Sequence, residues 1–528
     1  MDKKEIGDTV SLARSAGSVS VAVFLSRLLG LVREQVIAWL FGAGMATDAF
    51  VVAFRIPNLL RDLFAEGALS SAFVTVFTDY EEKRSREEVV RLVSNVLTVL
   101  TIVVSAVVIL GMVLSGWIVR LLAPDFSLIP GKLDLTKKLT LLMFPFLLLV
   151  SIAALFMGIL NARRHFFVPA FSSSCFNLGS IISGVLLAYL LPKWGIPAIF
   201  GMAAGVLTGG LTQLAVQVPL LRKEGLMPRP HVDLKSPGLR RIGRLIIPAV
   251  IGLSATQINI FINTHFASSC VEGSVTWLSY AFRLMQFPIG LFGVAISIAT
   301  LPVVSRLAAQ RDLKALGQTL VYSLTIAFAL TVPAAAGLWV LADPIVRLIF
   351  EHGRFTNFDT IMTAEALKYY AIGLMAYSAV KILVPVFYAL NDTRWPVIGS
   401  FSAVAFNILV ISLTLGSLAH RAIALSTSVT MILNFLLLAA ILYKKIGGFP
   451  AKRLFMSFAK ICLASLLMGA SILFIKAHVA LPGKTATLGL EVIGYIIAGA
   501  GIYTLTLFMF GLQELNEISS KILSRLKR

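Results

Sequence analysis

Long apolar segments recur along the whole chain, separated by short polar stretches. Most of them match or exceed the ~20 residues that a helix needs to cross the hydrocarbon core of a bilayer. The pattern predicts an all-α integral membrane protein with fourteen transmembrane helices. Their expected bounds are 12–41, 48–78, 89–122, 137–161, 168–190, 196–222, 239–268, 273–304, 314–349, 361–388, 396–416, 421–445, 452–477 and 487–511. Kinks are expected at Pro57, Pro145 and Pro288, inside these segments.

The sequence repeats itself at an interval of nearly half its length. Arg55 and Arg283 each end an Ala-Phe-Arg triplet and are 228 residues apart. Further matches at almost the same interval pair Arg120 with Arg347, Asn161 with Asn391 and Asn177 with Asn407. A register held this long indicates two copies of one six-helix unit. Because six is even, both copies enter the membrane in the same direction, which predicts two lobes related by a pseudo-two-fold axis around a central cavity.

The repeat and the basic loops together predict the domain organisation. The expected parts are a first lobe over 1–222, a basic cytoplasmic linker over 223–238, a second lobe over 239–445, and two further helices with a tail over 446–528. The loops 42–47 and 269–272 contain no Lys or Arg, whereas the basic clusters all fall on the opposite face of the predicted topology. Since Lys and Arg concentrate in cytoplasmic loops, we expect both termini in the cytoplasm and the protein in the cytoplasmic (inner) membrane.

Composition narrows the functional classes. The 528 residues are 58% hydrophobic and 14% charged, which agrees with a membrane protein. The formal charge of +20 would also suit nucleic acid, but cytoplasmic loops explain it, so no nucleic-acid partner is expected. Three cysteines in or beside apolar segments indicate neither a disulfide framework nor a metal site. The six histidines are scattered, and no catalytic motif occurs, so no metal, cofactor or enzymatic activity is expected.

The first two predicted spans are unusually polar. Charges inside the bilayer are costly and mark candidate functional sites. The polar residues are Arg27, Arg33 and Glu34 in the first span, and Asp48, Arg55, Asn58, Arg61, Asp62 and Glu66 in the second. Four of them follow three- and four-residue steps and so form one stripe, which must face protein or water. The stripe consists of Arg55, Asn58, Asp62 and Glu66. Mutual pairing of the acids and arginines would account for most of these charges.

Arg283 lies in the eighth span, where local pairing is harder to invoke. No acidic residue lies between Glu272 and Asp312 in the sequence. Its partner is therefore an acid on another span or an anion that comes and goes. We favour the anion, because a guanidinium donates paired hydrogen bonds to phosphate and keeps its charge in any environment.

Asp48 has two explanations at this stage. It begins the second span just after Gly42-Ala43-Gly44, where its carboxylate is placed to cap that helix. The alternative is a gate, in which an acid at the outer mouth of a cavity pairs with a cation in one state and releases it in another.

Several motifs together resemble one known family. They are Ser26-Arg27-Leu28-Leu29-Gly30-Leu31-Val32-Arg33, Phe41-Gly42-Ala43-Gly44, Thr47-Asp48-Ala49-Phe50, Pro57-Asn58-Leu59-Leu60-Arg61, Phe64-Ala65-Glu66-Gly67-Ala68, Tyr280-Ala281-Phe282-Arg283-Leu284-Met285-Gln286-Phe287-Pro288 and Gly353-Arg354-Phe355-Thr356. With them the chain resembles, over essentially its full length, the MurJ (MviN) family of bacterial lipid II flippases.

The resemblance implies the fold of the multidrug/oligosaccharidyl-lipid/polysaccharide exporter superfamily, with two final helices that form an apolar groove for a polyprenyl tail. It implies a role in peptidoglycan synthesis, in cell wall biogenesis and in maintaining cell shape. The expected activity is alternating-access transport of lipid II to the outer leaflet. The expected partners are lipid II, membrane lipids and proteins of cell-wall synthesis or division, and the chain is expected to be a monomer.

The family's site residues carry over by motif. Arg27, Arg33, Arg61 and Arg283 are the expected ligands of the substrate diphosphate. The family's essential aspartate carries over to Asp48, the expected gating acid. From the sequence itself, Glu66 is a second expected gating residue, and the candidate polar residues of the cavity are Glu34, Arg55, Asn58 and Gln286. Two positions depart from the family: Glu34 replaces the usual Asp and keeps its charge, while Phe282 replaces an Asp that commonly precedes the arginine of the eighth span.

Other functions remain as alternatives. A flippase for another polyprenyl-diphosphate-linked oligosaccharide needs the same cationic cavity. A membrane enzyme acting on polyprenyl phosphates would also gather arginines, but should show clustered catalytic acids or histidines. A drug exporter of the same superfamily favours an acidic cavity instead. Sodium coupling would need a carboxylate in spans seven, eleven or twelve, and none of these contains Asp or Glu.

Overall fold

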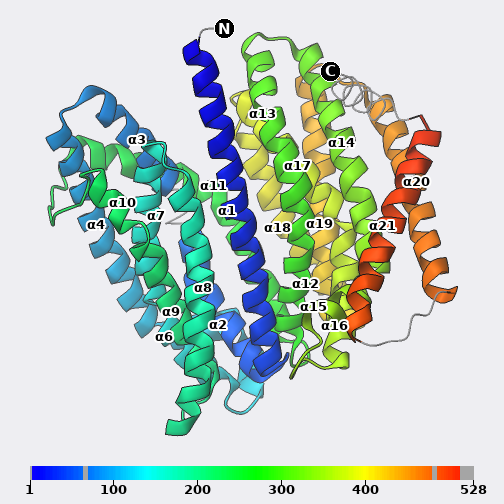
Figure 1. The fold of residues 1–528 in the computed structure, drawn as a ribbon, viewed down its shortest axis with the longest axis horizontal. Helices are drawn as coiled ribbons and strands as arrows, with labels where there is room; N and C mark the ends of the chain where they lie inside the picture. The colour runs from blue at the N-terminus through cyan, green and yellow to red at the C-terminus, as the bar shows by residue number, and fades with distance from the viewer. Residues whose placement is uncertain (1–2, 63–68, 479–484, 512–528) are drawn as a thin grey trace. The chain divides into compact units, whose positions relative to one another are not determined.

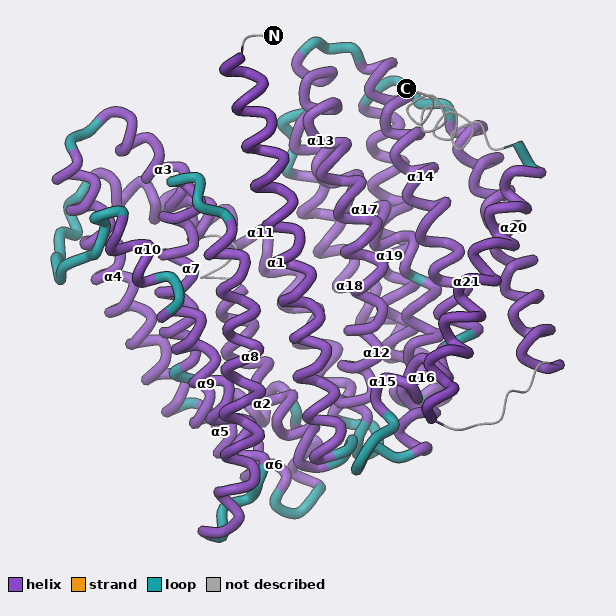
Figure 2. The backbone as a smooth tube through the Cα atoms, viewed as in Figure 1, coloured by secondary structure: helices purple, strands orange, loops and turns teal. Residues whose placement is uncertain are grey.

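The computed structural model describes residues 3–62, 69–478 and 485–511 (Figures 1 and 2). All regular structure within these ranges is helical, which confirms the predicted all-α class for the described part of the chain. Contacts between residues divide the chain into two compact units, Met1–Thr276 and Trp277–Arg528. The boundary between the units falls within the first turn of one helix.

The described residues of unit 1 form eleven α-helices and the start of a twelfth. They are α1 (Lys3–Phe41), α2 (Met45–Arg61), α3 (Ser70–Lys83), α4 (Arg86–Val113), α5 (Ser115–Leu122), α6 (Lys132–Met143), α7 (Phe146–Ala162), α8 (Phe167–Leu190), α9 (Ile199–Ala215), α10 (Val218–Lys223), α11 (Pro237–Ser268) and the first turn of α12 (Ser274–Pro288). Two short 3-10 segments, η2 (Pro124–Leu128) and η3 (Leu191–Trp194), lie in the connections.

Unit 2 continues from α12 in the same all-helical manner. A π-helical turn, η4 (Ile289–Gly293), joins α12 to α13 (Val294–Ala309). The remaining helices are α14 (Leu313–Val340), α15 (Ala342–Phe350), α16 (Asn357–Ile372), α17 (Leu374–Ala389), α18 (Arg394–Leu418), α19 (His420–Lys445), α20 (Ala451–His478) and α21 (Thr485–Met509).

Eleven helical segments of the described chain are long and apolar enough to cross a membrane. A twelfth follows if α16 and α17, which meet at a bend of 44°, form one span. The two predicted spans outside this set are the first and second, which carry the charged candidate residues. The total of fourteen therefore stays a prediction.

Prolines mark two of the helix breaks. Pro145 separates α6 from α7, and Pro288 ends α12 immediately before the π-helical turn. Proline lacks the amide hydrogen that would bond to the preceding turn, so both breaks follow from the sequence. Pro57 differs, because α2 continues through it to Arg61.

Glycines set the closest helix packing in unit 1, that of α9 on α8. Gly201, Gly205 and Gly209 recur every four residues on α9 and face the α8 backbone. A methyl group at Gly201 would lie 2.3 Å from the Ala188 nitrogen, and one at Gly205 would lie 2.7 Å from the Ser180 carbonyl oxygen. Only glycine allows this approach, which is how small residues bring membrane helices into contact.

The core of unit 2 joins its last two helices to the helices before them. One buried cluster includes Leu324 of α14, Leu383 of α17, Ala464 of α20 and Leu507 of α21. The Tyr503 hydroxyl of α21 also donates a hydrogen bond to the Ala329 carbonyl oxygen at 2.6 Å. The last two helices therefore contribute to the interior of unit 2 as well as to its surface.

Candidate substrate-binding and gating residues

Asp48 lies in the first turn of α2 with only 1% of its surface exposed. A buried carboxylate keeps its charge only when partners replace the lost water. Its Oδ2 accepts hydrogen bonds from the Lys132 ammonium and the Gly273 amide, both at 2.8 Å. Its Oδ1 accepts from the Thr276 amide at 3.0 Å and from the Thr276 hydroxyl at 2.6 Å. Four donors therefore fix the carboxylate.

Lys132 supplies the opposite charge from the first turn of α6. It is also 1% exposed, and its ammonium lies 4.3 Å from the centroid of the Phe126 ring, in cation–π contact. Burial of both charges makes the pair costly to break from one side only, since the remaining ion would be stranded. Lys132 is not among the residues expected from the sequence, where the available signal was a lysine that follows Pro130-Gly131 and precedes an apolar segment.

The hydrogen-bond partners of Asp48 bear on the explanation that it caps its own helix. The N-cap of α2 is Gly44, which has no side chain that could cap the helix. Asp48 instead binds amides at the start of α12, which have no partner within their own helix. The start of α2 is capped from outside as well, because the Met45 amide donates to Glu272 Oε1 at 2.7 Å. Of the two explanations of Asp48, capping of its own helix is the one that these hydrogen bonds do not support.

The starts of α2 and α12 thus cap each other with carboxylates. We call Met45, Asp48, Glu272 and Thr276 the reciprocal cap. Asp48 and Thr276 are 228 residues apart, and Met45 and Glu272 are 227 apart. These separations reproduce the interval of the sequence repeat, so residues at equivalent repeat positions touch each other here.

Arg33 and Glu34 form a second buried ion pair on α1. They are 7% and 8% exposed, and the Arg33 Nη2 lies 3.3 Å from Glu34 Oε1. The Arg33 guanidinium also lies 5.6 Å from the centroid of the Phe54 ring and 5.4 Å from that of Phe176. Charge pairing and cation–π contacts together hold this arginine inside unit 1.

The polar stripe on α2 lies against α11. Arg55 donates to the Thr264 hydroxyl at 2.5 Å. Asp62 pairs with Arg61 at 2.9 Å and lies 3.5 Å from the Gln257 amide nitrogen. This part of the stripe faces protein, as its spacing indicates.

The two other residues of the stripe are Asn58 and Glu66. Asn58 is half-buried, and Glu66 lies outside the described residues. Local pairing therefore accounts for part of the charge in the first two predicted spans.

Three further candidates are exposed to the surroundings. Arg27 is exposed on α1, and Arg283 and Gln286 are exposed on α12, where their spacing of three residues places them on one face. Phe282 is half-buried, with its ring centroid 5.4 Å from that of Tyr370 and 6.4 Å from that of Tyr377. An aromatic cluster therefore surrounds the position where the family commonly has an acid.

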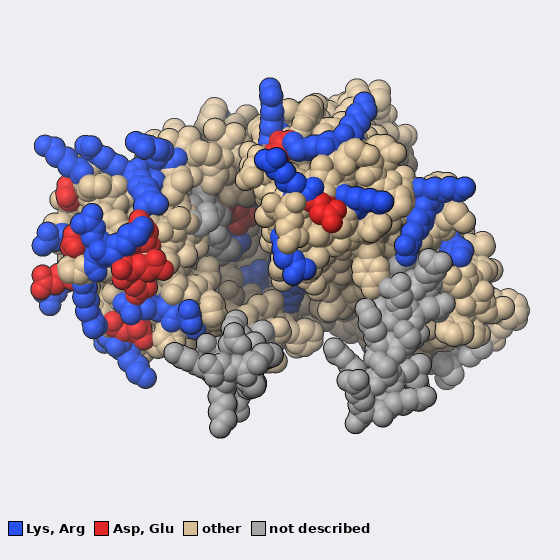
Figure 3. Space-filling view, turned by 90° about the horizontal axis from the view of Figure 1, so that it is seen from above, with Lys and Arg blue, Asp and Glu red and all other residues tan. Residues whose placement is uncertain are grey.

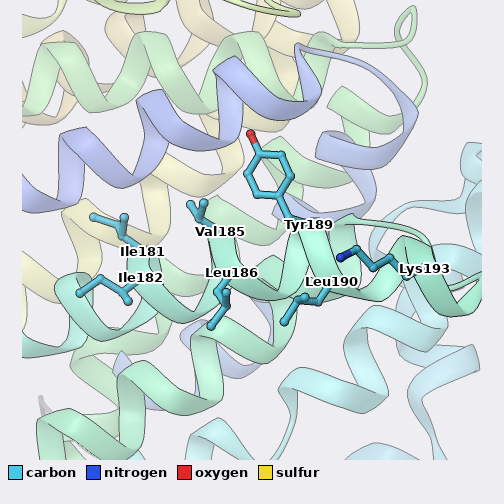
Figure 4. A pocket seen from close by; sticks show the side chains of 7 residues that line it. All are labelled: Ile181, Ile182, Val185, Leu186, Tyr189, Leu190 and Lys193. Carbon is cyan, nitrogen blue, oxygen red and sulfur yellow. The ribbon is translucent and has the colours of Figure 1, made fainter.

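A cavity of about 640 Å³ lies along α8, away from these candidates (Figure 4). Its lining consists of Ile181, Ile182, Val185, Leu186, Tyr189, Leu190 and Lys193. None of the predicted site residues lines it, and its outward apolar side chains suit contact with lipid. Among the described residues, no group of three or more His, Cys, Asp or Glu side chains is arranged to hold a metal ion.

Solved structures define the class of protein. An inward-facing MATE family transporter of the MOP superfamily matches with a TM-score of 0.67 over 80% of this chain and 94% of that one. At 15% identity this likeness shows the fold alone, a multidrug-exporter type of membrane transporter fold. The structure described as lipid II flippase MurJ, inward closed conformation, matches with a TM-score of 0.78 at 28% identity, over 93% of this chain and 98% of that one.

Sequence comparison gives the family. The family model described as Lipid II flippase MurJ matches residues 37–491. A probable lipid II flippase MurJ of Buchnera aphidicola is 36% identical over 469 residues, which are 89% of this chain and 91% of that protein. The lipid II flippase MurJ of Burkholderia cenocepacia is 35% identical over 438 residues, 81% of this chain and 83% of that protein. The chain belongs to the lipid II flippase MurJ family, a family of transporters rather than enzymes.

Proposed function

We propose that this chain carries lipid II from the inner to the outer leaflet of the cytoplasmic membrane by alternating access. Family membership over most of the chain is the observation that carries the proposal. Unaided passage of lipid II through the bilayer is too costly, because its diphosphate, sugar and peptide would lose their water in hydrocarbon. A transporter that offers cations along the path lowers this barrier.

The diphosphate is assigned to Arg27, Arg33, Arg61 and Arg283. Arg27 and Arg283 support the assignment, because both side chains are exposed. A guanidinium binds phosphate with two parallel hydrogen bonds and does not lose its charge. The neighbouring polar residues assigned to the headgroup path are Glu34, Arg55, Asn58 and Gln286.

Gating is assigned to the reciprocal cap, with Asp48 as its central acid. Its four donors and its burial support the role, since the carboxylate is held by two different helices, α6 and α12. In the predicted topology the starts of α2 and α12 face the outside of the cell. Opening requires Asp48 to leave the start of α12, and substrate binding must favour that change differentially. Glu66 remains a gating candidate from sequence alone.

The finer architecture is part of the same proposal. Of fourteen membrane-spanning helices, twelve form two lobes over 1–222 and 239–445. The linker 223–238 joins the lobes, and both termini lie in the cytoplasm. The last two helices, within 446–528, hold the polyprenyl tail, and the chain works as a monomer. The repeat interval in the reciprocal cap supports two lobes related by a pseudo-two-fold axis, because such an axis brings equivalent residues together.

Rescue of a bacterium depleted of its own lipid II flippase tests the proposed function. The wild-type chain should restore growth and cell shape, and Arg283→Glu, inserted in the membrane at the same level, should not. A wild-type chain that is inserted normally yet restores nothing would contradict the proposal.

A further inference from the structure

A second cavity, which has a polar lining, lies in unit 1 where α3 ends and α11 begins. Its volume is about 430 Å³, and its lining consists of Asp79, Tyr80, Lys83, Arg84, Pro237, Gly238 and Arg241. Three of these residues are cations and one is an acid. Figure 3 shows Lys and Arg side chains gathered on this end of the unit, with Asp and Glu among them. None of the residues assigned to transport lines this cavity.

Asp79 holds two of the cations at its two oxygens. Lys83 donates to Oδ1 and Arg241 donates to Oδ2, each at 2.5 Å. These hydrogen bonds, with that from Lys83 the larger cause, lower the pKa of the Asp79 carboxyl. Arg84, the third cation, pairs with Glu88 at 3.6 Å outside the lining. One lining carboxylate thus positions two cations from different helices, and the lining keeps an excess of positive charge.

The start of α11 adds to this positive potential. The helix begins with Pro237, and its N-cap Ser236 makes no side-chain capping hydrogen bond. The first-turn amides and the helix dipole both favour an anion at this end. The 32 residues of α11 include no Asp or Glu, and Arg240 and Arg244 are exposed beside the cavity's Arg241.

The cavity also lies at the boundary between polar and apolar chain. The apolar run of α11 begins at Leu245, directly after Arg244. Basic residues next to the end of a membrane helix attract anionic lipid. The lining matches a phosphate group, because Arg241 offers a forked donor, Lys83 a compact cation and Tyr80 a hydroxyl.

We propose that this cavity binds the phosphate of an anionic lipid headgroup at the membrane surface. The phosphate takes the place of Asp79 as the shared partner of Lys83 and Arg241, and so connects the end of α3 to the start of α11. The site is separate from substrate transport, and the inference does not depend on the proposed function. The competing explanation is that Asp79 and its two cations serve only as salt bridges within the protein.

Asp79→Asn separates the two explanations. Removal of the competing carboxylate should strengthen lipid binding if the cavity is an anion site, whereas lost salt bridges alone would only destabilise the protein. The double variant Lys83→Gln/Arg241→Gln should weaken binding by roughly thirtyfold, because each basic residue near the surface adds to the attraction. Lys193→Gln, a cation at the end of the α8 cavity, is the matched control and should bind as wild type.

The measurement is binding of phosphatidylglycerol, titrated into the full-length protein in phosphatidylcholine nanodiscs. Inorganic phosphate is titrated in parallel, and thermal stability is recorded for every variant. The proposal expects tighter binding by Asp79→Asn, weaker binding by the double variant, and little effect of inorganic phosphate at the same concentration. A response to inorganic phosphate without one to phosphatidylglycerol would overturn the lipid assignment. Unchanged or weaker lipid binding by Asp79→Asn would overturn the site.

Discussion

Asp48 and Thr276 are hydrogen-bonded through both the backbone and the side chain of the threonine, at 3.0 and 2.6 Å. They are 228 residues apart, the same separation as between Arg55 and Arg283. The contact therefore joins equivalent positions of the two sequence repeats. A carboxylate in one copy and a hydroxyl in the other make the contact attractive, whereas two carboxylates at these positions would repel.

The buried pair of Asp48 and Lys132 should dominate the energetics of this contact. Asp48→Asn should lower the free energy of unfolding by about 3–5 kcal/mol, because it strands a buried ammonium. Lys132→Met should cost a similar amount by stranding the carboxylate. The double variant should recover part of the loss, since neither charge remains. Thermal unfolding of the four proteins in detergent gives the coupling between the two positions.

Asp134 and Lys138 on the same helix provide the matched control. They are an exposed pair, 61% and 60% accessible, at 2.6 Å. A double-mutant cycle of Asp134 and Lys138 should show a coupling free energy of roughly 0.5 kcal/mol or less, as is usual for exposed ion pairs. Equal couplings in the two cycles would contradict the account of Asp48. The double variant at Asp48 and Lys132 should also fail to transport, because restored stability does not restore the cap on α12.

Thr276 tests the hydroxyl contact separately. Thr276→Val keeps the shape and the backbone amide but removes a donor to a charged acceptor, which should cost about 1.5–3 kcal/mol. Thr276→Ser should retain most of the stability. Thr325 is buried, and its hydroxyl has no hydrogen-bond partner within the part of the chain that the structure describes, so Thr325→Val is the control. Melting temperatures that fall equally in the two valine variants would argue against a specific bond to Asp48.

Substitutions of Arg283 test the assignment of the diphosphate ligands most directly. Arg283→Ala should abolish most lipid II binding and transport, and Arg283→Lys should restore only part because an ammonium lacks the bidentate fork. Arg283→Glu should be inactive through repulsion. Binding and thermal stability are measured on the same purified variants. Stable protein without binding supports the assignment, whereas lost stability with unchanged affinity would point to a structural role.

Removal of the last two helices should lower thermal stability as well as abolish transport, whereas the sequence repeat predicts loss of transport alone. The repeat alone predicts that deletion of residues 452–528 abolishes transport and leaves both lobes folded. In the structure, Ile461 and Ala464 of α20 and Leu507 of α21 are buried in the core of unit 2. We therefore expect the truncated protein to lose thermal stability as well as transport. Wild-type stability of the truncated protein would show that this packing contributes little.

The helices were largely predictable because their signals are local. Apolar runs of membrane length and the positions of Pro145 and Pro288 are visible in the sequence, and the structure places helices and breaks there. Clustering of polar residues on α2 was predictable for the same reason, since three- and four-residue steps define a helix face.

The partners of Asp48 depend on contacts that no local pattern encodes. Lys132 and Gly273 come from helix starts 84 and 225 residues away. A carboxylate after a glycine-rich turn looks like the cap of its own helix, and only the three-dimensional arrangement shows that it caps another. One signal was present: the repeat interval relates Asp48 to Thr276, as it relates Arg55 to Arg283.

Translocation of labelled lipid II in proteoliposomes that contain only this chain tests the central claim most directly. Lipid II is placed in one leaflet, and its arrival in the other is followed with a membrane-impermeant reagent, with and without an imposed membrane potential or ion gradient. The wild-type chain should move lipid II faster than protein-free vesicles do, and Arg283→Glu should not. Transfer by the wild-type chain at the rate of protein-free vesicles under every condition, or equal transfer by Arg283→Glu, would contradict the account.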